Sequence, residues 1–368
     1  MSRPSAGRLE RVREAMAEHH LDAVLLSLGA DLPWLSGYEA MPLERLTMLV
    51  VPADGEATLV VPRLEAPRVE VDPGVFGVRS YAEGEDPVAV VAGLVGGAGV
   101  RLAVSDRAWA TFVLDLQRAL PGTSWSAAST ITGPLRAIKD DAEVAALAMA
   151  AAAADAVAAD LLAGRIPLIG RTERSVSDDI GRRLIAEGHQ KVNFAIVGSG
   201  PNSASPHHEP GSRRIGAGEP VVCDFGGTMD GYCSDITRTV WTGTEPPADF
   251  AALYRLLEAA QAAAVRAAVV GVACEDVDAA ARRPIAAAGY GEAFIHRTGH
   301  GIGLEEHEGP YIVAGNTTGL SAGHAFSVEP GIYLEGRFGA RIEDIVVATE
   351  AGPRSLNTVS HAMTVVDA

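Results

Sequence analysis

The sequence predicts a mixed α/β (α+β) protein with a small N-terminal domain, residues 1–134, and a larger C-terminal domain, residues 135–368. Helix-type and strand-type patterns alternate through the first third of the chain, which is typical of an α/β domain. A break near residues 130–139 precedes a long Ala-rich helix, and metal-binding residue types gather in the last 145 residues. A chain of 368 residues has ample material for one to three domains.

The N-terminal domain is predicted to contain three helices and four strands. Leu9, Val12 and Met16 recur at helical spacing, and the apolar run after them indicates a buried strand. Asp54-Gly55 lies between two further apolar runs, which indicates a hairpin. The expected elements are a helix over 5–20, a strand over 22–28, hairpin strands over 46–51 and 57–61, a helix near 86–97, a strand over 101–105 and a helix near 107–119.

The C-terminal domain is predicted to begin with a long helix that ends near Leu162. Asp140 or Asp141 is the expected N-cap, because a short acidic side chain accepts hydrogen bonds from the first free N–H groups of a helix. Its most apolar part, residues 145–164, contains two aspartates. We therefore expect a helix of a soluble protein and not a membrane span.

The net charge, the N-terminal residues and the cysteine spacing argue against several kinds of partner and site. The net charge is −17 and no Lys/Arg-rich run stands out, which argues against nucleic-acid or anionic-membrane partners. The N-terminal residues carry arginines without an apolar core, so no signal peptide is expected and a cytoplasmic location is predicted. The cysteines, Cys223, Cys233 and Cys274, show neither zinc-site nor disulfide spacing and are expected to be small buried side chains.

Two aspartates, Asp224 and Asp235, flank a Gly/Asp-rich centre between apolar runs, which indicates a hairpin. A turn at residues 229–230 would pair them directly, with Cβ atoms about 4.5–5.5 Å apart. Two divalent metals about 3.5–4 Å apart fit such a gap. We adopt this register, although a turn at residues 230–231 would instead pair Asp224 with Thr237.

Three more ligand-type residues follow: His300, Glu329 and Glu343. With the two aspartates they make one imidazole and four carboxylates. Such a hard, oxygen-rich set suits Mn²⁺, Co²⁺ or Zn²⁺. Each residue alone would more often be a cap or a solvated turn residue, whereas the combination points to a metal centre.

In order and local context, these five residues resemble the dinuclear metal ligands of the pita-bread metallopeptidases, which include methionine aminopeptidase, aminopeptidase P and prolidase. The closest resemblance is to the aminopeptidase P/prolidase branch. It rests on Ser199 to His208, Gly231 to Thr239, Gly299 to Gly303 and His307 to Pro310. The resemblance implies a creatinase/prolidase-type N-terminal domain followed by a pita-bread catalytic domain.

The function that this resemblance implies is hydrolysis of the bond between an N-terminal residue and proline. An Xaa-Pro dipeptidase is preferred, and aminopeptidase P acting on longer peptides is the alternative, since both share the metal ligands. Two divalent ions per chain, Mn²⁺ before Co²⁺ or Zn²⁺, small peptide substrates with proline in second position, and a homodimer are expected. A non-catalytic pita-bread binding protein and a creatinase-like amidinohydrolase are remote alternatives, because all five ligands are kept.

The resemblance also assigns catalytic residues. His207 is expected beside the substrate, where it donates a hydrogen bond near the scissile amide. His307 is expected to stabilise the tetrahedral intermediate. Glu329, also a metal ligand, is expected to accept the proton of the attacking water and pass it to the leaving nitrogen. His208 and His296 are weaker candidates.

Substrate contacts are expected from His207, Arg341 and Trp34. Arg341 lies two residues before Glu343, and residues i and i+2 share one face of a strand. It is expected either to orient a metal ligand or to bind a substrate carboxylate bidentately. Trp34 belongs to a loop that approaches the partner's active site in related dimers, although it could instead be a core residue.

Overall fold

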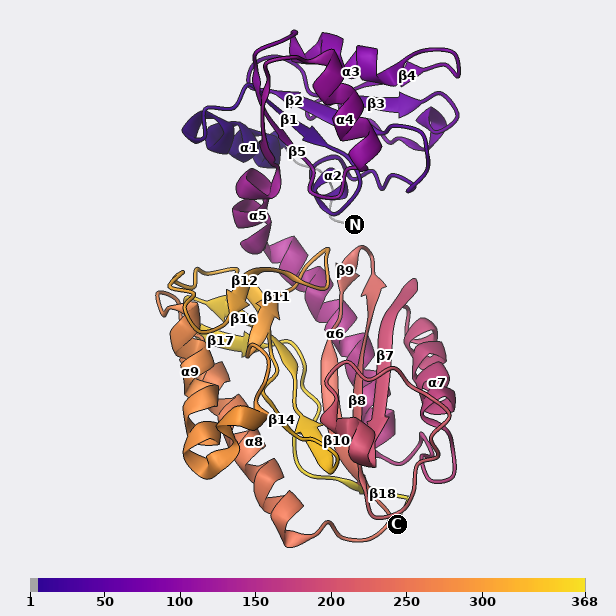
Figure 1. Ribbon diagram of the computed structural model, residues 1–368, viewed down its shortest axis with the longest axis vertical. Coiled ribbons are helices and arrows are strands. Elements are labelled where there is room, and N and C mark those ends of the chain that lie inside the picture. The colour runs from indigo at the N-terminus through magenta and orange to yellow at the C-terminus, as the bar shows by residue number, and fades with distance from the viewer. Residues whose placement is uncertain (1–5, 368) are drawn as a thin grey trace. The chain divides into compact units, whose positions relative to one another are not determined.

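The computed structural model describes residues 6–367 and divides into two compact units, Met1–Arg136 and Ala137–Ala368 (Figure 1). The division lies two residues after the expected domain boundary. The mixed α/β class predicted from the sequence is confirmed.

The N-terminal unit is built on a six-stranded sheet with the order β4-β3-β2-β1-β5-β6. Its strands are β1 (Ala23–Leu26), β2 (Met48–Pro52), β3 (Thr58–Pro62), β4 (Gly77–Tyr81), β5 (Arg101–Val104) and β6 (Ser124–Ala127). Its helices are α1 (Ala6–Glu18), α2 (Asp31–Ser36), the short η1 (Ala66–Arg68), α3 (Pro87–Val95), α4 (Ala110–Ala119) and α5 (Ser129–Ala137).

All seven elements expected in this unit are present, and five were missed: α2, the short η1, β4, β6 and α5. β4 and β6 are the two edge strands of the sheet and are largely accessible to water. Their sequences therefore lack the apolar run that marks a central strand such as β1, which is buried along its whole length.

The C-terminal unit contains two main sheets and a two-stranded ribbon. Their orders are β18-β10-β8-β7, with β9 paired to β8; β12-β11-β13-β16-β17; and β14-β15. The strands are β7 (Lys191–Ser199), β8 (Pro220–Met229), β9 (Tyr232–Cys233), β10 (Ile236–Thr242), β11 (Gly299–Gly301), β12 (Glu308–Ile312), β13 (Ala325–Val328), β14 (Gly331–Leu334), β15 (Phe338–Arg341), β16 (Asp344–Thr349), β17 (Gly352–Ser355) and β18 (Val365–Val366).

Helices pack on each main sheet (Figure 1). The helices are α6 (Asp141–Leu162), α7 (Glu173–Ala186), α8 (Ala248–Ala267) and α9 (Cys274–Ile285), with short turns η2 (Gly200–Ala204), η3 (Ala286–Tyr290) and η4 (Gly291–Ala293). Apolar residues of α6 and α7 share one core with β7, β8 and β10. Those of α8 and α9 share another with β13 to β16. Each sheet thus has its own helical cover, as expected for a pita-bread catalytic domain.

Helix α6 begins as the sequence predicts. Asp140 is the N-cap and forms a capping box with Glu143. The helix is long and apolar enough to cross a membrane by length and composition alone, but half of that stretch is buried inside the structure. Its Ala-rich face packs against β8, β9 and β10, and this packing accounts for its apolar composition.

The adopted register of the central hairpin is wrong, and the alternative is observed. Met229 pairs with Tyr232 and Asp224 with Thr237, so the turn lies at residues 230–231. Both turn residues have positive φ, 48° and 88°, which is the two-residue turn that Asp-Gly favours. The partner of Asp224 shifts by two residues, which preserves the face on which each side chain lies.

Candidate active site

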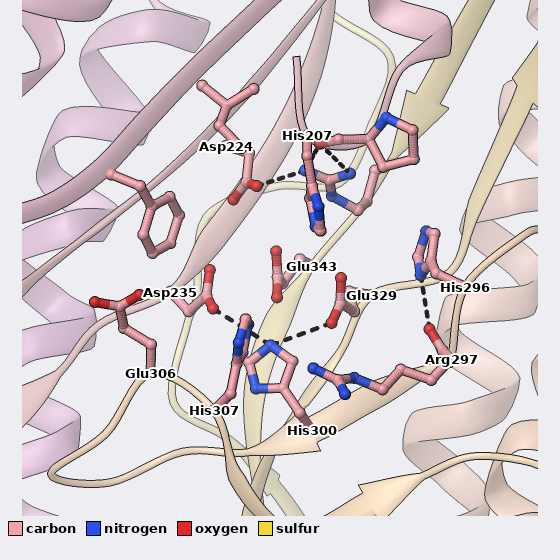
Figure 2. A pocket seen from close by; sticks show the side chains of 14 residues that line it. His207, Asp224, Asp235, His296, Arg297, His300, Glu306, His307, Glu329 and Glu343 are labelled. Carbon is pink, nitrogen blue, oxygen red and sulfur yellow. Dashed lines mark hydrogen bonds and ion pairs between the residues drawn. The ribbon is translucent and has the colours of Figure 1, made fainter. Parts of the chain in front are cut away.

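A cavity of about 430 Å³ opens in the C-terminal unit (Figure 2). It brings together every predicted site residue except Trp34. The lining residues are Phe194, Ile196, Pro206, His207, Asp224, Asp235, His296, Arg297, His300, Glu306, His307, Glu329, Arg341 and Glu343.

Both main sheets deliver ligand-type side chains to this cavity. Asp224 lies on β8, and Asp235 lies just before β10. His300 is the middle residue of β11, Glu329 directly follows β13, and Glu343 lies between β15 and β16. These positions at strand ends and strand junctions let five side chains from distant segments converge.

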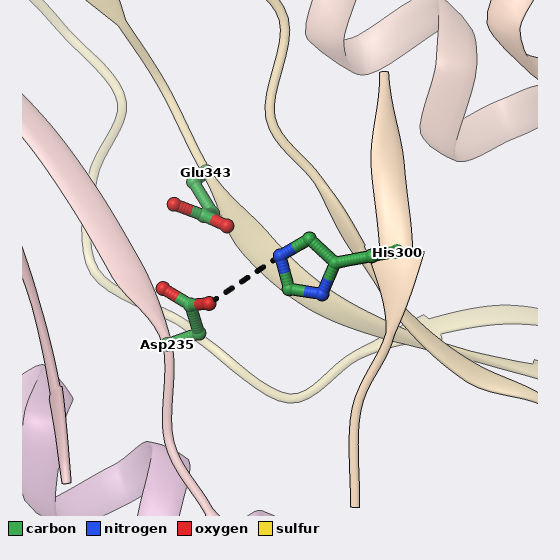
Figure 3. A group of neighbouring side chains, drawn as sticks. All are labelled: Asp235, His300 and Glu343. Carbon is green, nitrogen blue, oxygen red and sulfur yellow. Dashed lines mark ion pairs between the residues drawn. The ribbon is translucent and has the colours of Figure 1, made fainter. Parts of the chain in front are cut away.

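The tightest part of the site is formed by Asp235, His300 and Glu343 (Figure 3). One donor atom from each lies within 4.8 Å of the others, and all three residues are buried. The Nε2 atom of His300 lies 3.7 Å from Asp235 Oδ2 and 3.3 Å from Glu329 Oε1. This spacing matches a group of ligands around a shared cation.

The electrostatics of the cluster favour a cation. Burial, followed by the neighbouring carboxylates, raises the pKa of Asp235 and of Glu343 well above the usual range. Burial likewise raises the pKa of Glu329 to about 7, although the charge of Arg341 opposes this shift. Carboxylates held this close repel one another unless protons or metal ions lie between them.

His300 presents a lone pair to these carboxylates. Burial lowers the pKa of its ring to about 3, so the imidazole is neutral near pH 7. Its Nδ1 lies 3.1 Å from the carbonyl oxygen of Gly301, and the natural arrangement has Nδ1–H donating to that oxygen. Nε2 then faces carboxylate oxygens without a proton of its own, and a metal ion would satisfy all of these atoms.

An unpaired carboxylate oxygen also indicates that these residues fit a metal ion. Asp224 Oδ1 is buried, and among the described residues it has no hydrogen-bond partner. A buried carboxylate oxygen without a partner is costly in an apoprotein and is expected at a ligand position. The residues present therefore fit a divalent-metal centre held by Asp224, Asp235, His300, Glu329 and Glu343.

Arg341 is enclosed by protein acceptors. Its Nε donates to Thr237 Oγ1 at 3.0 Å, and its Nη1 donates to Tyr333 Oη at 2.8 Å. Nη2 pairs with Asp224 Oδ2, and both Nη atoms also lie 3.4–3.5 Å from the carbonyl oxygen of Pro206. Because all five N–H donors have a protein acceptor and the residue is buried, the geometry favours the orienting role over the expected contact with a substrate carboxylate.

Hydroxyl groups hold two of the other carboxylates. Thr237 Oγ1 donates to Glu343 Oε2 at 2.6 Å. Ser327 Oγ donates to Glu329 Oε1 at 3.0 Å, a contact that sequence reasoning missed. These bonds fix the orientation of the carboxylates in advance of metal binding.

The two histidines that are expected to act on the substrate, His207 and His307, are exposed and line the cavity. The ring of His307 lies edge-on to that of His300, with centroids 4.1 Å apart. Partial burial, followed by the charge of Arg297, lowers the pKa of His307. A neutral ring that reaches the open cavity can donate to a substrate oxygen near pH 7.

Next to His207, a buried carboxylate that sequence reasoning missed organises the loop. Glu173 is fully buried and accepts from Ser199 N at 2.9 Å and from Asn202 Nδ2 at 3.0 Å. Its Oε2 also lies 2.8 Å from His208 Nε2. His208 therefore points to a structural anchor and not into the cavity. The Gly/Pro/Ser-rich loop gives no sequence signal for a partner that lies in α7.

Trp34 is buried inside the N-terminal unit. Its side chain is only 1% exposed, and the Arg8 guanidinium lies 5.3 Å from the centroid of its ring. The core alternative therefore describes Trp34 within this chain, and an approach of its loop to a partner's active site stays a prediction. The other cavity residues that sequence reasoning missed are Phe194, Ile196, Pro206, Arg297 and Glu306, and of these Pro206 lies inside a recognised motif, Ser199 to His208.

Comparisons with known proteins agree with this arrangement. The model of metallopeptidase family M24 matches residues 136–350, and that of the creatinase/prolidase N-terminal domain matches residues 8–138. The chain is 46% identical over 365 residues to the probable dipeptidase PepE of Mycobacterium tuberculosis, which covers 98% of this chain and 96% of that protein.

Two solved structures share the whole fold. Dipeptidase PepE from Mycobacterium ulcerans has 47% identity and a TM-score of 0.92, and the match covers 99% of this chain and 100% of that chain. Recombinant prolidase from Thermococcus sibiricus has 35% identity and a TM-score of 0.91, with 98% of each chain covered.

Proposed function

This chain belongs to metallopeptidase family M24, and we propose that it is an Xaa-Pro dipeptidase. The observation that carries the proposal is the convergence of five ligand-type side chains in one cavity of about 430 Å³. The whole-chain similarity to proteins called dipeptidase and prolidase supports the substrate class. A cavity of this volume is suited to a small ligand.

The proposed cofactor is a pair of divalent ions, with Mn²⁺ preferred over Co²⁺ and Zn²⁺. Four carboxylates and one imidazole form a hard ligand set, which suits Mn²⁺. Asp224, Asp235, His300, Glu329 and Glu343 would hold the ions. When bound, such ions polarise a carbonyl group and lower the pKa of water toward neutrality.

Side chains of the protein are proposed to transfer the proton and to bind the substrate oxygens. Glu329 is proposed to accept the proton of the attacking water and to transfer it to the leaving nitrogen. His307 and His207 are proposed to donate N–H bonds to the substrate oxygens at the attacked carbonyl.

Preference for proline is proposed to come from an apolar wall. Phe194 and Ile196 of β7, together with Pro206, line one part of the cavity. A pyrrolidine ring can pack against such a surface. A peptide bond to proline also lacks an N–H, so a site that takes it must bind the substrate without using that donor.

The test is hydrolysis by metal-loaded protein of Ala-Pro, Ala-Ala and Ala-Pro-Ala, before and after chelation. Ala-Pro is expected to give the highest kcat/KM, with activity lost on chelation and restored by Mn²⁺. Faster cleavage of Ala-Pro-Ala would favour aminopeptidase P. No cleavage of either proline peptide by the Mn²⁺-loaded protein would reject the proposal.

A further inference from the structure

The cavity contains two arginines that differ in their partners. Every N–H of Arg341 meets a protein acceptor, as described above. Within residues 6–367, the guanidinium of Arg297 forms no hydrogen bond or ion pair, although it lines the same cavity. Arg297 is therefore the arginine that can accept a new anionic partner.

An aromatic ring holds Arg297 in place. The residue lies two positions before β11, and its guanidinium carbon is 4.7 Å from the centroid of the Tyr311 ring on β12. Stacking on a ring face stabilises the charge and leaves the N–H donors at the edge of the guanidinium free. In Figure 2 its side chain extends toward Glu329 and His300.

The acidic groups of the lining are the proposed metal ligands and one further carboxylate. Five carboxylates face the cavity: those of Asp224, Asp235, Glu306, Glu329 and Glu343. All of them except Glu306 are proposed metal ligands, and Glu306 would repel the carboxylate end of a peptide bound beside it. Arg297 offers the opposite charge with a planar fork of donors that matches a carboxylate.

We infer that Arg297 binds the C-terminal carboxylate of the dipeptide and thereby selects dipeptides over longer peptides. This inference rests on the proposed function, because it names the group that recognises the second residue of the same substrate. In a dipeptide, the carboxylate belongs to the residue directly after the scissile bond. A longer peptide carries a neutral amide there and cannot form a charge-assisted pair with Arg297.

The experiment compares Ala-Pro with Ala-Pro-amide, which differ in this carboxylate alone. Wild-type protein is expected to favour the acid, and Arg297→Met is expected to lower kcat/KM for the acid by about tenfold to a hundredfold, the usual scale for a hydrogen-bonded charge pair. The amide rate should change by less than about threefold, because no charge pair is lost. Arg297→Lys, which keeps the charge but loses the fork, should fall between the two.

Arg337→Met is the matched control. Arg337 also stacks on an aromatic ring, at 4.8 Å from the Phe338 centroid, but it does not line the cavity. This variant should leave the acid-to-amide ratio unchanged. An equal loss on acid and amide in Arg297→Met, or a wild-type protein that does not distinguish them, would overturn the inference.

A binding experiment distinguishes failure of the proposed peptidase function from failure of the carboxylate site. If no proline peptide is cleaved, calorimetry with proline and prolinamide tests the carboxylate site directly. Tighter binding of proline to wild type, lost in Arg297→Met, supports the inference. Equal binding of the two ligands rejects it.

Discussion

The guanidinium of Arg341 is held entirely by protein atoms, so at the scale of single residues we expect it to orient Asp224. The position of Arg341 follows from the sequence, because it shares a strand face with Glu343. Its partners do not follow from the sequence. Tyr333 lies eight residues away and Pro206 lies 135 residues away, and no local pattern reports such contacts.

The variant Arg341→Lys tests this function. Lysine keeps the charge but cannot bridge Thr237, Tyr333 and Asp224 at once. We expect kcat/KM to fall about tenfold or more on Ala-Pro and by the same factor on Ala-Pro-Ala, since a displaced ligand affects every substrate. Metal retained after dialysis should fall too. Steady-state kinetics at saturating Mn²⁺ decides the matter, and a loss confined to the dipeptide would restore the substrate-clamp interpretation.

His207 and His307 are expected to act on the substrate and not on the metals. Replacing either with alanine should lower kcat by about a hundredfold, the usual scale for one positioned acid/base group or donor. Metal content should remain near that of the wild type, because neither ring is part of the ligand cluster. Parallel measurement of kcat and metal stoichiometry checks this, and metal loss in His307→Ala would show that its role is wrongly assigned.

At the scale of elements, the central hairpin shows what the sequence could predict. The sequence predicts both strands and the Gly/Asp-rich turn between them, and it is compatible with two registers. The Asp230-Gly231 pair, with positive φ at both residues, decides between them. The difference between the adopted and the observed register does not change the predicted site. The strand partner of Asp224 moves by two residues, and a shift of two keeps Asp224 and Asp235 on the face toward the cavity.

The loop that carries His207 depends on Glu173, which could not be found from the sequence because its partners converge only after α7 packs beside β7. We expect Glu173→Gln to destabilise the protein by about 1–3 kcal/mol, since a buried acceptor becomes a partial donor. It should also lower kcat about tenfold, because a small misplacement of His207 weakens its contact with the substrate.

The matched control is Glu143→Gln. Glu143 is also a buried carboxylate, but it belongs to the capping box of α6 and does not line the cavity. A similar loss of stability with unchanged kcat is expected, as measured by urea unfolding and steady-state kinetics. If both variants keep wild-type kcat, Glu173 has no positioning role.

At the scale of the whole molecule, the division into two units was visible as a change of pattern near residues 130–139. The sequence pattern does not show that the second unit contains two sheets, each covered by helices. Sheet β12-β11-β13-β16-β17 joins short strands with irregular spacing, and β11 has only three residues. Such strands give almost no period-2 signal, so this half of the fold came from the resemblance alone.

The buried carboxylates also connect the metal centre to the stability of the whole chain. Burial and neighbouring carboxylates raise the pKa of Asp235 and Glu343 above their unfolded values, and burial raises that of Glu329 to about 7. A group with a raised folded-state pKa contributes stability that is fully present below its unfolded pKa. That contribution is lost as the pH rises through the folded pKa.

We therefore expect the metal-free protein to lose stability between about pH 4.5 and pH 7, the window that the unfolded and folded pKa values of Glu329 define. Metal binding requires the same carboxylates to be ionised, so Mn²⁺ should bind more tightly as the pH rises. The Tm difference between Mn²⁺-loaded and chelated protein should widen from pH 5 to pH 8 by several degrees.

Asp235→Asn, which removes one repelling charge, should raise the Tm of the metal-free protein near pH 8 and reduce the response to Mn²⁺. Scanning calorimetry across this range gives both quantities, and a Tm difference that stays constant or narrows with rising pH would show that these carboxylates do not share a cation.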